Sequence, residues 1–221
     1  MTSRHAAHHS VAQPPTRKEA MALTAVVVVA LLWSGIVASD RLTWFLEVVW
    51  ILLALPLLVA NWRRFPLTRL LCWLLAAHAL VLIHGGTYTY AQTPLGFGLR
   101  DLGNALGLEV VRNPWDRVGH VMQGFVPAIL ARELLLRLTP LQRGGWLVYL
   151  VLAACLSFSA LFELIEWWAA LAFGADADAF LATQGDQWDT QWDMFLCLCG
   201  AMASLLLWSR LHDRQLGARA A

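Results

Sequence analysis

Six long apolar runs, separated by polar segments, make up most of this chain. Each run is near the roughly 20 residues that an α-helix needs to cross the hydrocarbon core of a bilayer. The fourth run is the least apolar, because His120, Gln123, Arg132 and Glu133 interrupt it. The pattern predicts an all-α fold, a polytopic membrane protein built as a bundle of about six transmembrane helices. The expected spans are residues 20–38, 44–60, 67–84, 118–137, 146–173 and 188–208.

The polar segments define the rest of the organisation. Residues 1–19 and 211–221 are expected to be cytoplasmic tails, the first of them disordered, on either side of a transmembrane domain over 20–210. The connection over 85–117 is too apolar and aromatic for a free linker, so we expect it to fold over the mouth of the bundle, with a short helix near 99–107. A signal peptide is the less favoured interpretation of the first run, because five more spans follow it.

The composition agrees with a membrane protein. Of 221 residues, 59% are hydrophobic and 14% are charged, whereas a soluble domain has about 45–50% apolar and about 25% charged residues. The net charge of +1 gives no indication of a nucleic acid partner. All four cysteines lie inside apolar runs, so we interpret them as small apolar residues without a disulfide or zinc role. The expected partner of the chain is the lipid bilayer.

The basic residues predict the orientation of the bundle. With six spans both termini lie on one side, and twelve of the sixteen Lys and Arg residues fall on that side. Basic residues concentrate on the cytoplasmic side of membrane proteins, so we expect both termini in the cytoplasm. The four basic residues on the opposite, extracytoplasmic side are Arg41, Arg100, Arg112 and Arg117.

Several ionisable residues lie within or beside the spans, in their extracytoplasmic half. An ionisable group at the centre of a membrane helix costs about 2.5–3.5 kcal/mol on insertion, so such groups are rare and usually functional. In the predicted orientation, the starts of the fourth and sixth spans and the end of the fifth meet in one leaflet. The residues concerned are Asp116, His120, Glu163, Glu166, Asp186, Asp189 and Asp193.

The spacing of these residues gives each helix one polar face. Within each helix they are three or four residues apart, as Asp116 and His120 are, and residues at this spacing share a helix face. Each helix can therefore turn its polar pair toward a common interior point, as carboxylate-bridged metal bundles do. The alternative explanations are capping for the acids near helix starts and interhelical hydrogen bonds for the mid-helix glutamates. At the cytoplasmic interface, Arg132 and Glu133 are expected to pair with each other.

Charge balance favours a bound cation at the meeting point. Six carboxylates at short range cannot all ionise unless something offsets the negative charge. A divalent ion such as Mg, Mn, Fe or Zn suits oxygen ligands combined with one imidazole. The predicted metal ligands are Asp116, His120, Glu163, Glu166, Asp189 and Asp193, and the predicted catalytic residues are Glu163, Glu166 and Asp193.

Three functions are compatible with such a buried carboxylate and histidine site, open to the extracytoplasmic side. The favoured one is a divalent-metal-dependent enzyme on an envelope or lipid-linked substrate, with a metal-activated water as nucleophile and a spare carboxylate as base. The second is a proton- or cation-coupled transporter that uses the same acids as a relay. The third is a non-catalytic membrane protein in which the ion only holds helices together. The inner halves of the spans offer few polar residues for a transport path, which favours the enzyme.

Four segments of the sequence resemble one known family. They are residues 112–120 (RNPWDRVGH), 123–127 (QGFVP), 163–168 (ELIEWW) and 183–193 (TQGDQWDTQWD). Over about residues 20–210 the chain resembles the YjdF-like bacterial inner membrane proteins, the DUF2238 family, which implies an inner-membrane location and a multi-pass fold but no particular reaction. A fainter resemblance is to the VanZ-like membrane proteins, which show an Asp-x-x-x-His helix, a Glu-x-x-Gln helix and a last helix with spaced Asp. Asp116 with His120 and Glu163 with Glu166 match this pattern, except that Glu166 replaces the Gln.

Overall fold

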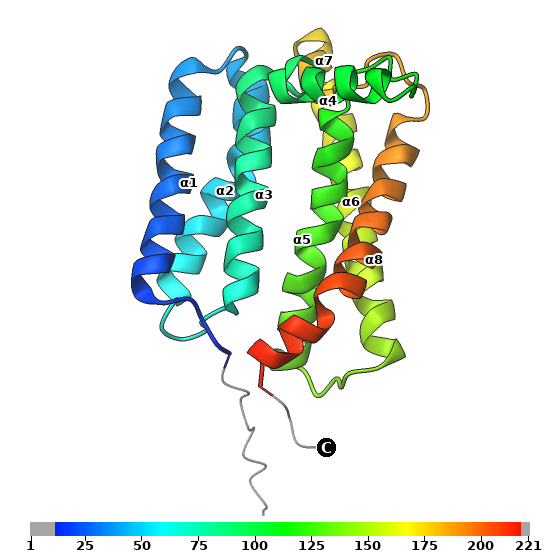
Figure 1. Cartoon of the computed structure of the whole chain (residues 1–221). Helices are drawn as coiled ribbons and strands as arrows, with labels where there is room; N and C mark the ends of the chain where they lie inside the picture. Colours follow the sequence, from blue (N-terminus) through cyan, green and yellow to red (C-terminus); the bar gives the residue numbers. More distant parts are fainter. Residues whose placement is uncertain (1–11, 218–221) are drawn as a thin grey trace, which may run out of the picture.

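The structure, a computed structural model of the chain, describes residues 12–217, apart from the side chains of residues 176–178. Within this part every regular element is a helix (Figure 1). The long helices are α1 (Arg17–Val37), α2 (Arg41–Asn61), α3 (Arg69–Tyr88), α5 (Trp115–Leu138), α6 (Gly145–Phe173) and α8 (Asp189–Gln215). The short ones are η1 (Tyr90–Gln92), α4 (Pro94–Ala105), η2 (Gly174–Ala177) and α7 (Asp178–Leu181).

Five helices of the described chain are long and apolar enough to cross a membrane: α1, α2, α3, α6 and α8. The helix α5 has 24 residues but is less apolar, because it carries five buried polar or charged side chains. These are Asp116, His120, Gln123, Arg132 and Glu133. Figure 1 shows α5 running alongside α6 and α8, so its polar groups face neighbouring helices and not lipid. The predicted all-α membrane bundle is confirmed, and α5 occupies the place of the remaining predicted span.

Short polar signals set several helix ends. Thr16 accepts a hydrogen bond from the backbone N–H of Glu19 over 3.2 Å, and Asp40 accepts one from the backbone N–H of Thr43 over 2.6 Å. Both are N-caps, which satisfy backbone donors that the first helical turn leaves free. Helices such as α8, which reaches Gln215, extend past the apolar runs because a polar turn can continue a helix outside the hydrocarbon.

The helices form two groups of three, α1–α2–α3 and α5–α6–α8 (Figure 1). The first group has its own apolar core around Val48, Ile51 and Ile83. The core of the second group includes Val151 of α6 and Ala201 of α8. The groups meet where α3 packs against α5 and where the ring of Trp50 of α2 contacts the ring of Phe158 of α6. A cavity remains between the groups along part of their length.

Both described ends of the chain lie at one face of the bundle, which we call the termini face; the opposite one is the loop face (Figure 1). The backbone N–H of Gln13 donates to the carbonyl of Gln215 over 2.8 Å, and the N–H of Arg69 donates to the carbonyl of Gln13 over 2.9 Å. The predicted tail over 1–19 is therefore packed from Ala12 onward, with α1 already starting at Arg17. Residues 1–11 of that tail and 218–221 of the other lie outside the described residues.

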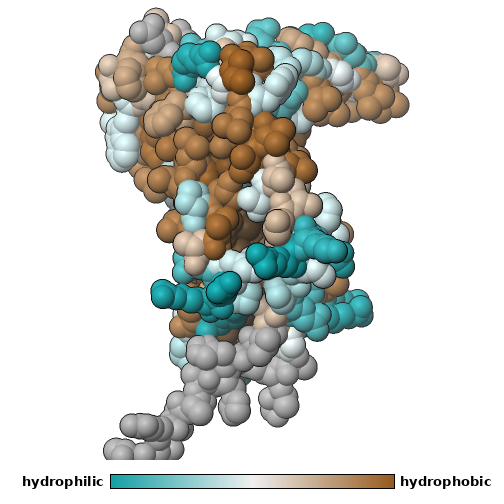
Figure 2. Space-filling view, turned by 90° about the vertical axis from the view of Figure 1, so that its left-hand side faces the viewer, coloured by the Kyte–Doolittle hydropathy of each residue, from teal (hydrophilic) through white to brown (hydrophobic). Residues whose placement is uncertain are grey.

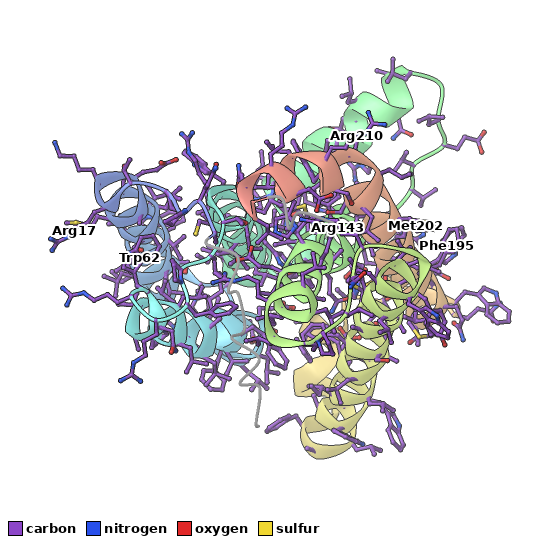
Figure 3. The ribbon with its side chains drawn as sticks, turned by 90° about the horizontal axis from the view of Figure 1, so that it is seen from below. Arg17, Trp62, Arg143, Phe195, Met202 and Arg210 are labelled. Carbon is purple, nitrogen blue, oxygen red and sulfur yellow. The ribbon has the colours of Figure 1, made fainter. Side chains whose placement is uncertain are left out.

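Between these two faces the surface is apolar. Figure 2 shows this on the side that α1 covers, where hydrophobic residues lie between hydrophilic ends. At the loop face, α4 runs across the direction of the long helices (Figure 1) and projects beyond them when the bundle is seen from below (Figure 3). Its leucines Leu95, Leu99 and Leu102, followed by Leu106, are exposed and share one helix face. The helix expected near 99–107 is thus found over Pro94–Ala105.

Candidate functional site

Two glycines bring α5 and α8 into close contact. A Cβ atom added at Gly124 would meet the backbone carbonyl of Cys197, and one added at Gly200 would meet the backbone of Val121 and Phe125. Small residues at such contacts let helix backbones approach each other closely in membranes. The approach sets the first turns of α5 and α8, which carry most of the predicted site residues, side by side at the loop face.

The outer layer of the site consists of arginine–aspartate ion pairs. Arg112 donates hydrogen bonds to Asp189 and, over 2.8 Å, to Asp116, while Arg117 binds Asp186 over 2.7 Å. Burial alone would lower the pKa of Arg112, but the hydrogen bond to Asp189 and the charge of Asp116 raise it above its ordinary value. Arg112 therefore stays charged, and it ties the start of α5 to the start of α8.

The cover of the site comes from the two ends of the 85–117 connection and from the segment before α8. The backbone N–H of Asn113 donates to Gln184 Oε1 over 2.9 Å, and Gln184 Nε2 donates back to the Asn113 carbonyl over 3.0 Å. Asn113 Nδ2 also donates to the carbonyl of Thr93 over 3.0 Å. The ends of the connection thus lie over the mouth, as expected, whereas α4 in its middle projects away from it.

The inner layer is a compact group of Asp116, His120 and Asp193. One ligand atom from each residue lies within 4.8 Å of the others, and all three residues are buried. His120 Nε2 lies 3.4 Å from Asp116 Oδ1 and 3.7 Å from Asp193 Oδ1. Both distances exceed the 2.7–3.2 Å typical of an N–H···O hydrogen bond, so the three side chains surround a common point without closing on it.

Gln123 determines which nitrogen of His120 faces that point. His120 Nδ1 lies 3.2 Å from Gln123 Oε1. An amide oxygen can only accept, so with this amide orientation Nδ1 carries the hydrogen and Nε2 is free to offer a lone pair toward the two aspartates. Histidines that bind metals almost always donate their second N–H to an oxygen in this way.

Two buried carboxylate oxygens in this region have no hydrogen-bond partner among the described residues. They are Asp193 Oδ1 and Glu163 Oε1. Asp193 is 2% exposed and Glu163 8% exposed, so bulk water does not compensate them. A buried carboxylate oxygen without a partner costs at least 1–3 kcal/mol, and this unmet need points to a cation or a proton as the partner.

A cavity of about 790 Å³ lies against the inner layer, between the two helix groups. Asp116, His120 and Glu166 line it, together with Glu47 and Tyr90. Glu47 is 4% exposed in the middle of α2 and had no place in the predicted site. An acidic residue inside a predicted span is the pattern that pointed to the other acids, and Glu47 is the one acidic residue of the second apolar run. The sequence could therefore have indicated it.

The predicted ligands therefore separate into three sets. Asp116, His120 and Asp193 form the compact group. Asp189 lies outside this group and, like Asp116, is bound to Arg112. In the described part of the chain, Glu163 and Glu166 do not belong to the compact group: the first has an unpaired buried oxygen, and the second lines the cavity.

At the termini face the predicted Arg132–Glu133 pair is wrong. Adjacent residues on a helix point in different directions, and each finds its own partners. Arg132 binds Asp213 over 2.6 Å, whereas Glu133 accepts hydrogen bonds from Arg137 over 2.6 Å and from His212 over 3.0 Å. Arg132 also donates to His212 Nδ1 over 2.9 Å, which leaves Nε2–H of a neutral imidazole to donate to Glu133.

Comparison with known proteins agrees with this architecture. Residues 19–214 match the family described as "Predicted membrane protein (DUF2238)". The inner membrane protein YjdF of Escherichia coli (strain K12) is 50% identical over 186 residues, which cover 84% of this chain and 87% of that protein. No solved structure matches the chain.

The match to an inner membrane protein and the apolar helices together identify a multi-pass inner membrane protein. The resemblance to the YjdF-like proteins is confirmed, and the fainter one to VanZ-like proteins stays a prediction. By the match over residues 19–214, the chain belongs to the DUF2238 family of predicted membrane proteins.

Proposed function

We propose that this protein is an inner-membrane enzyme that binds a divalent cation at Asp116, His120 and Asp193 and acts on an envelope or lipid-linked substrate. The observation that carries the proposal is the convergence of three buried ligand atoms within 4.8 Å of one another. Within that group, Asp193 Oδ1 has no hydrogen-bond partner among the described residues.

The separations of the ligand atoms fit an ion. Two ligands that lie ~2.0–2.1 Å from a tetrahedral ion are ~3.3–3.4 Å apart. The two distances from His120 Nε2, 3.4 Å to Asp116 and 3.7 Å to Asp193, are close to that separation and too long for direct hydrogen bonds. Two carboxylates with one imidazole suit Mg, Mn, Fe or Zn.

The distribution of charge supports a cation in the inner layer and not in the outer one. Arg112 and Arg117 already offset the outer acids Asp186 and Asp189. Among the described residues, no Lys or Arg pairs with Asp193, Glu163, Glu166 or Glu47. Within the inner layer Asp116 also pairs with Arg112 over 2.8 Å, whereas Asp193 has, among the described residues, His120 as its one nearby candidate cation.

The side chains around the group suggest a division of roles. A divalent ion there would supply Lewis acidity and a water of lowered pKa. Glu163, with its unpaired oxygen, is the general base in this proposal. Glu166 lines the cavity and contacts the substrate, while Asp189 holds Arg112 and so fixes the mouth of the site.

Two alternatives are less well supported. A proton or cation transporter needs a hydrated path to the other face, but most of the cavity lining between the site and the termini face is apolar. An ion that merely holds helices together is not needed between α5 and α8, because their backbones already touch at Gly124 and Gly200.

The proposal also orients the protein in the membrane. The described basic residues at the termini face include Arg17, Arg143 and Arg210, labelled in Figure 3, which is seen from that side. Concentration of basic residues on the cytoplasmic side puts both termini in the cytoplasm and opens the site to the extracytoplasmic side. A substrate there would be a component of the outer leaflet or the envelope.

Isothermal titration of the purified, chelator-stripped chain with Mg²⁺, Mn²⁺, Fe²⁺ and Zn²⁺ tests the cation site. We expect one ion per chain for at least one metal, and at least tenfold weaker binding in Asp193→Asn. Asp101→Asn is the matched control, because this acid of the loop face has a side chain that is 66% exposed and lies outside the site. Equal affinities in the two variants, or no binding by the wild type, would refute the cation site.

The enzyme part needs its own readout. Metal-loaded protein is incubated with a bacterial membrane lipid extract, and products are identified by mass spectrometry. We expect a product that chelator abolishes and that Glu163→Gln does not form, although this variant still binds the ion. A lipid profile that stays the same with metal-loaded wild type would exclude an enzyme acting on membrane lipids.

A further inference from the structure

The cavity between the two helix groups extends far beyond the ionisable site. Its lining runs from Arg17 and Trp62 at the termini face to Tyr90 and Asp116 at the loop face. Its volume of about 790 Å³ is in the range of ligand sites, roughly 300–1,000 Å³. Five of the six long helices, α1, α2, α3, α5 and α6, contribute to it, so it is formed by both helix groups.

Most of this cavity is unsuitable for water. A water molecule inside a protein needs two to four polar partners. Between the ends of the cavity the lining is mostly aliphatic and aromatic, with Thr24, His78 and Gln123 as the polar members. Hydrocarbon is the occupant that such a lining stabilises.

One end of the cavity is polar and acidic. Glu47 lies six residues into α2 and Glu166 seven residues before the end of α6, so at 1.5 Å per residue both are about 9–10 Å below the loop face. The ring of Tyr90 lies against Gly85 and Gly119, neither of which leaves room for a side chain there. The two carboxylates and the phenol therefore border the same end of the cavity from three different elements.

We infer that this cavity binds a single lipid-like amphiphile, whose hydrocarbon chain lies between the helix groups and whose head group donates hydrogen bonds to Glu47 and Glu166. Charge complementarity selects the head group: two carboxylates without an Arg or Lys partner among the described residues favour an ammonium or hydroxyl group over an anionic one. The inference deepens the proposed function by naming the class of substrate. It rests on the proposed function only in assuming that the reaction takes place at the cation site.

Photolabelling of the full-length chain in lipid nanodiscs tests this inference. The probes are C16 amphiphiles that carry a diazirine at mid-chain and differ only in the head group: amine, alcohol or sulfate. Mass spectrometry is expected to find the label on cavity-lining residues of α1 and α3, between Met21 and Val28 and between Leu75 and Leu82. The amine and alcohol probes should label these segments at least fivefold more than the sulfate probe.

Two neighbouring alanines of α3 give a matched pair of variants. Ala76 lines the cavity, whereas Ala77 is exposed on the outer side of the helix. Ala76→Phe should reduce labelling of the cavity about tenfold, and Ala77→Phe should leave it unchanged. Glu47→Gln should reduce labelling by the amine probe more than labelling by the alcohol probe, because an amide accepts a hydrogen bond but does not pair with a charge.

The outcomes separate this inference from the cation site. Cavity labelling that persists in chelator supports the lipid site whether or not an ion binds. Label confined to residues that do not line the cavity in the wild type, or equal labelling by all three head groups, would overturn the inference even if the metal titration succeeds. Because the wild-type map decides this alone, the test does not depend on the folding of any variant.

Discussion

Replacing Glu133 by Gln tests how far the buried network at the termini face stabilises the fold. Glu133 is fully buried and accepts hydrogen bonds from the hydroxyl of Thr68 over 2.7 Å, from Arg137 over 2.6 Å and from His212 over 3.0 Å. It thereby joins the start of α3 to the ends of α5 and α8. Removal of one partner from a buried ion pair costs roughly 3–5 kcal/mol.

The lower part of that range applies if Arg137 keeps its other contacts. Its guanidinium also donates to the carbonyl of Pro66 over 2.7 Å and lies 3.6 Å from the centre of the Phe65 ring. For the lower value of about 3 kcal/mol, at about 2–4 °C per kcal/mol for a chain of this size, we expect Glu133→Gln to lower the unfolding midpoint in detergent by roughly 6–12 °C. Intrinsic tryptophan fluorescence measures this transition.

The control is Arg143→Gln at the same face. Arg143 pairs with Asp213, and the two side chains are 35% and 33% exposed. Pairs this exposed are worth about 0–1 kcal/mol. The midpoint of Arg143→Gln should fall by no more than about 4 °C, and divalent ion binding at the distant site should be unchanged in both variants. A Glu133→Gln midpoint within 2 °C of the wild type, or equal to that of Arg143→Gln, would show that this network contributes little to the stability of the fold.

Three further predictions concern the site and its placement. Gln123→Leu should weaken divalent ion binding about 10–100-fold in calorimetry, because it removes the hydrogen bond that fixes the His120 ring; affinity equal to the wild type would contradict the role of Nε2 as ligand. An exposed leucine face is typical of helices that lie in the membrane interface. A spin label at Leu102 of α4 should therefore be accessible to oxygen dissolved in lipid, whereas a spin label at Asp101 should be accessible to a water-soluble relaxant. Identical accessibility of the two labels would place α4 away from the membrane. Reporter fusions after residues 105 and 215 should read extracytoplasmic and cytoplasmic, and a cytoplasmic reading at 105 would reverse the orientation of the site.

Hydrophobic length and helix spacing together predicted most of the fold. The long helices are found where apolar runs of about 20 residues stand, since in lipid the backbone must satisfy its own hydrogen bonds. What the pattern could not supply was the contact between helices distant in the sequence. The approach of Gly124 to the carbonyl of Cys197 depends on the faces that α5 and α8 turn to each other, and hydropathy does not report it.

The sequence indicated which residues of the candidate site lie near one another better than it indicated which of them pair. Helix periodicity puts Asp116 and His120 on one face, and the structure has them in contact. It also pointed to Asp189, but Arg112 occupies this carboxylate. That pairing could not be inferred from periodicity, because Arg112 lies before α5 and reaches α8 through the fold of the loop.

The prediction missed Glu47 and His212 for different reasons. Glu47 is the one acidic residue of the second apolar run, so the sequence pattern could have identified it. His212 lies in the last turns of α8, whose other ionisable groups are expected at the cytoplasmic end. His212 is fully buried between Arg132 and Glu133. The sequence of the last turns of a helix does not show whether a residue there is buried by other elements. Burial of a polar group is decided by the neighbouring helices, so it needs the tertiary structure.

The low hydropathy of α5 is itself an argument about function. A helix that faced lipid could not carry Asp116, His120 and Gln123 at one end and Glu133 at the other without a large cost of insertion. Here each of these side chains is buried against another helix, and the ones at the loop face are drawn together at a point that an ion fits. The network around Glu133 has its own protein partners and is satisfied within the described structure. The inner layer at the loop face is not, because Asp193 Oδ1 and Glu163 Oε1 lack partners among the described residues. This difference between the two ends of α5 is the basis for proposing a bound cation at the loop face and a stabilising role at the termini face.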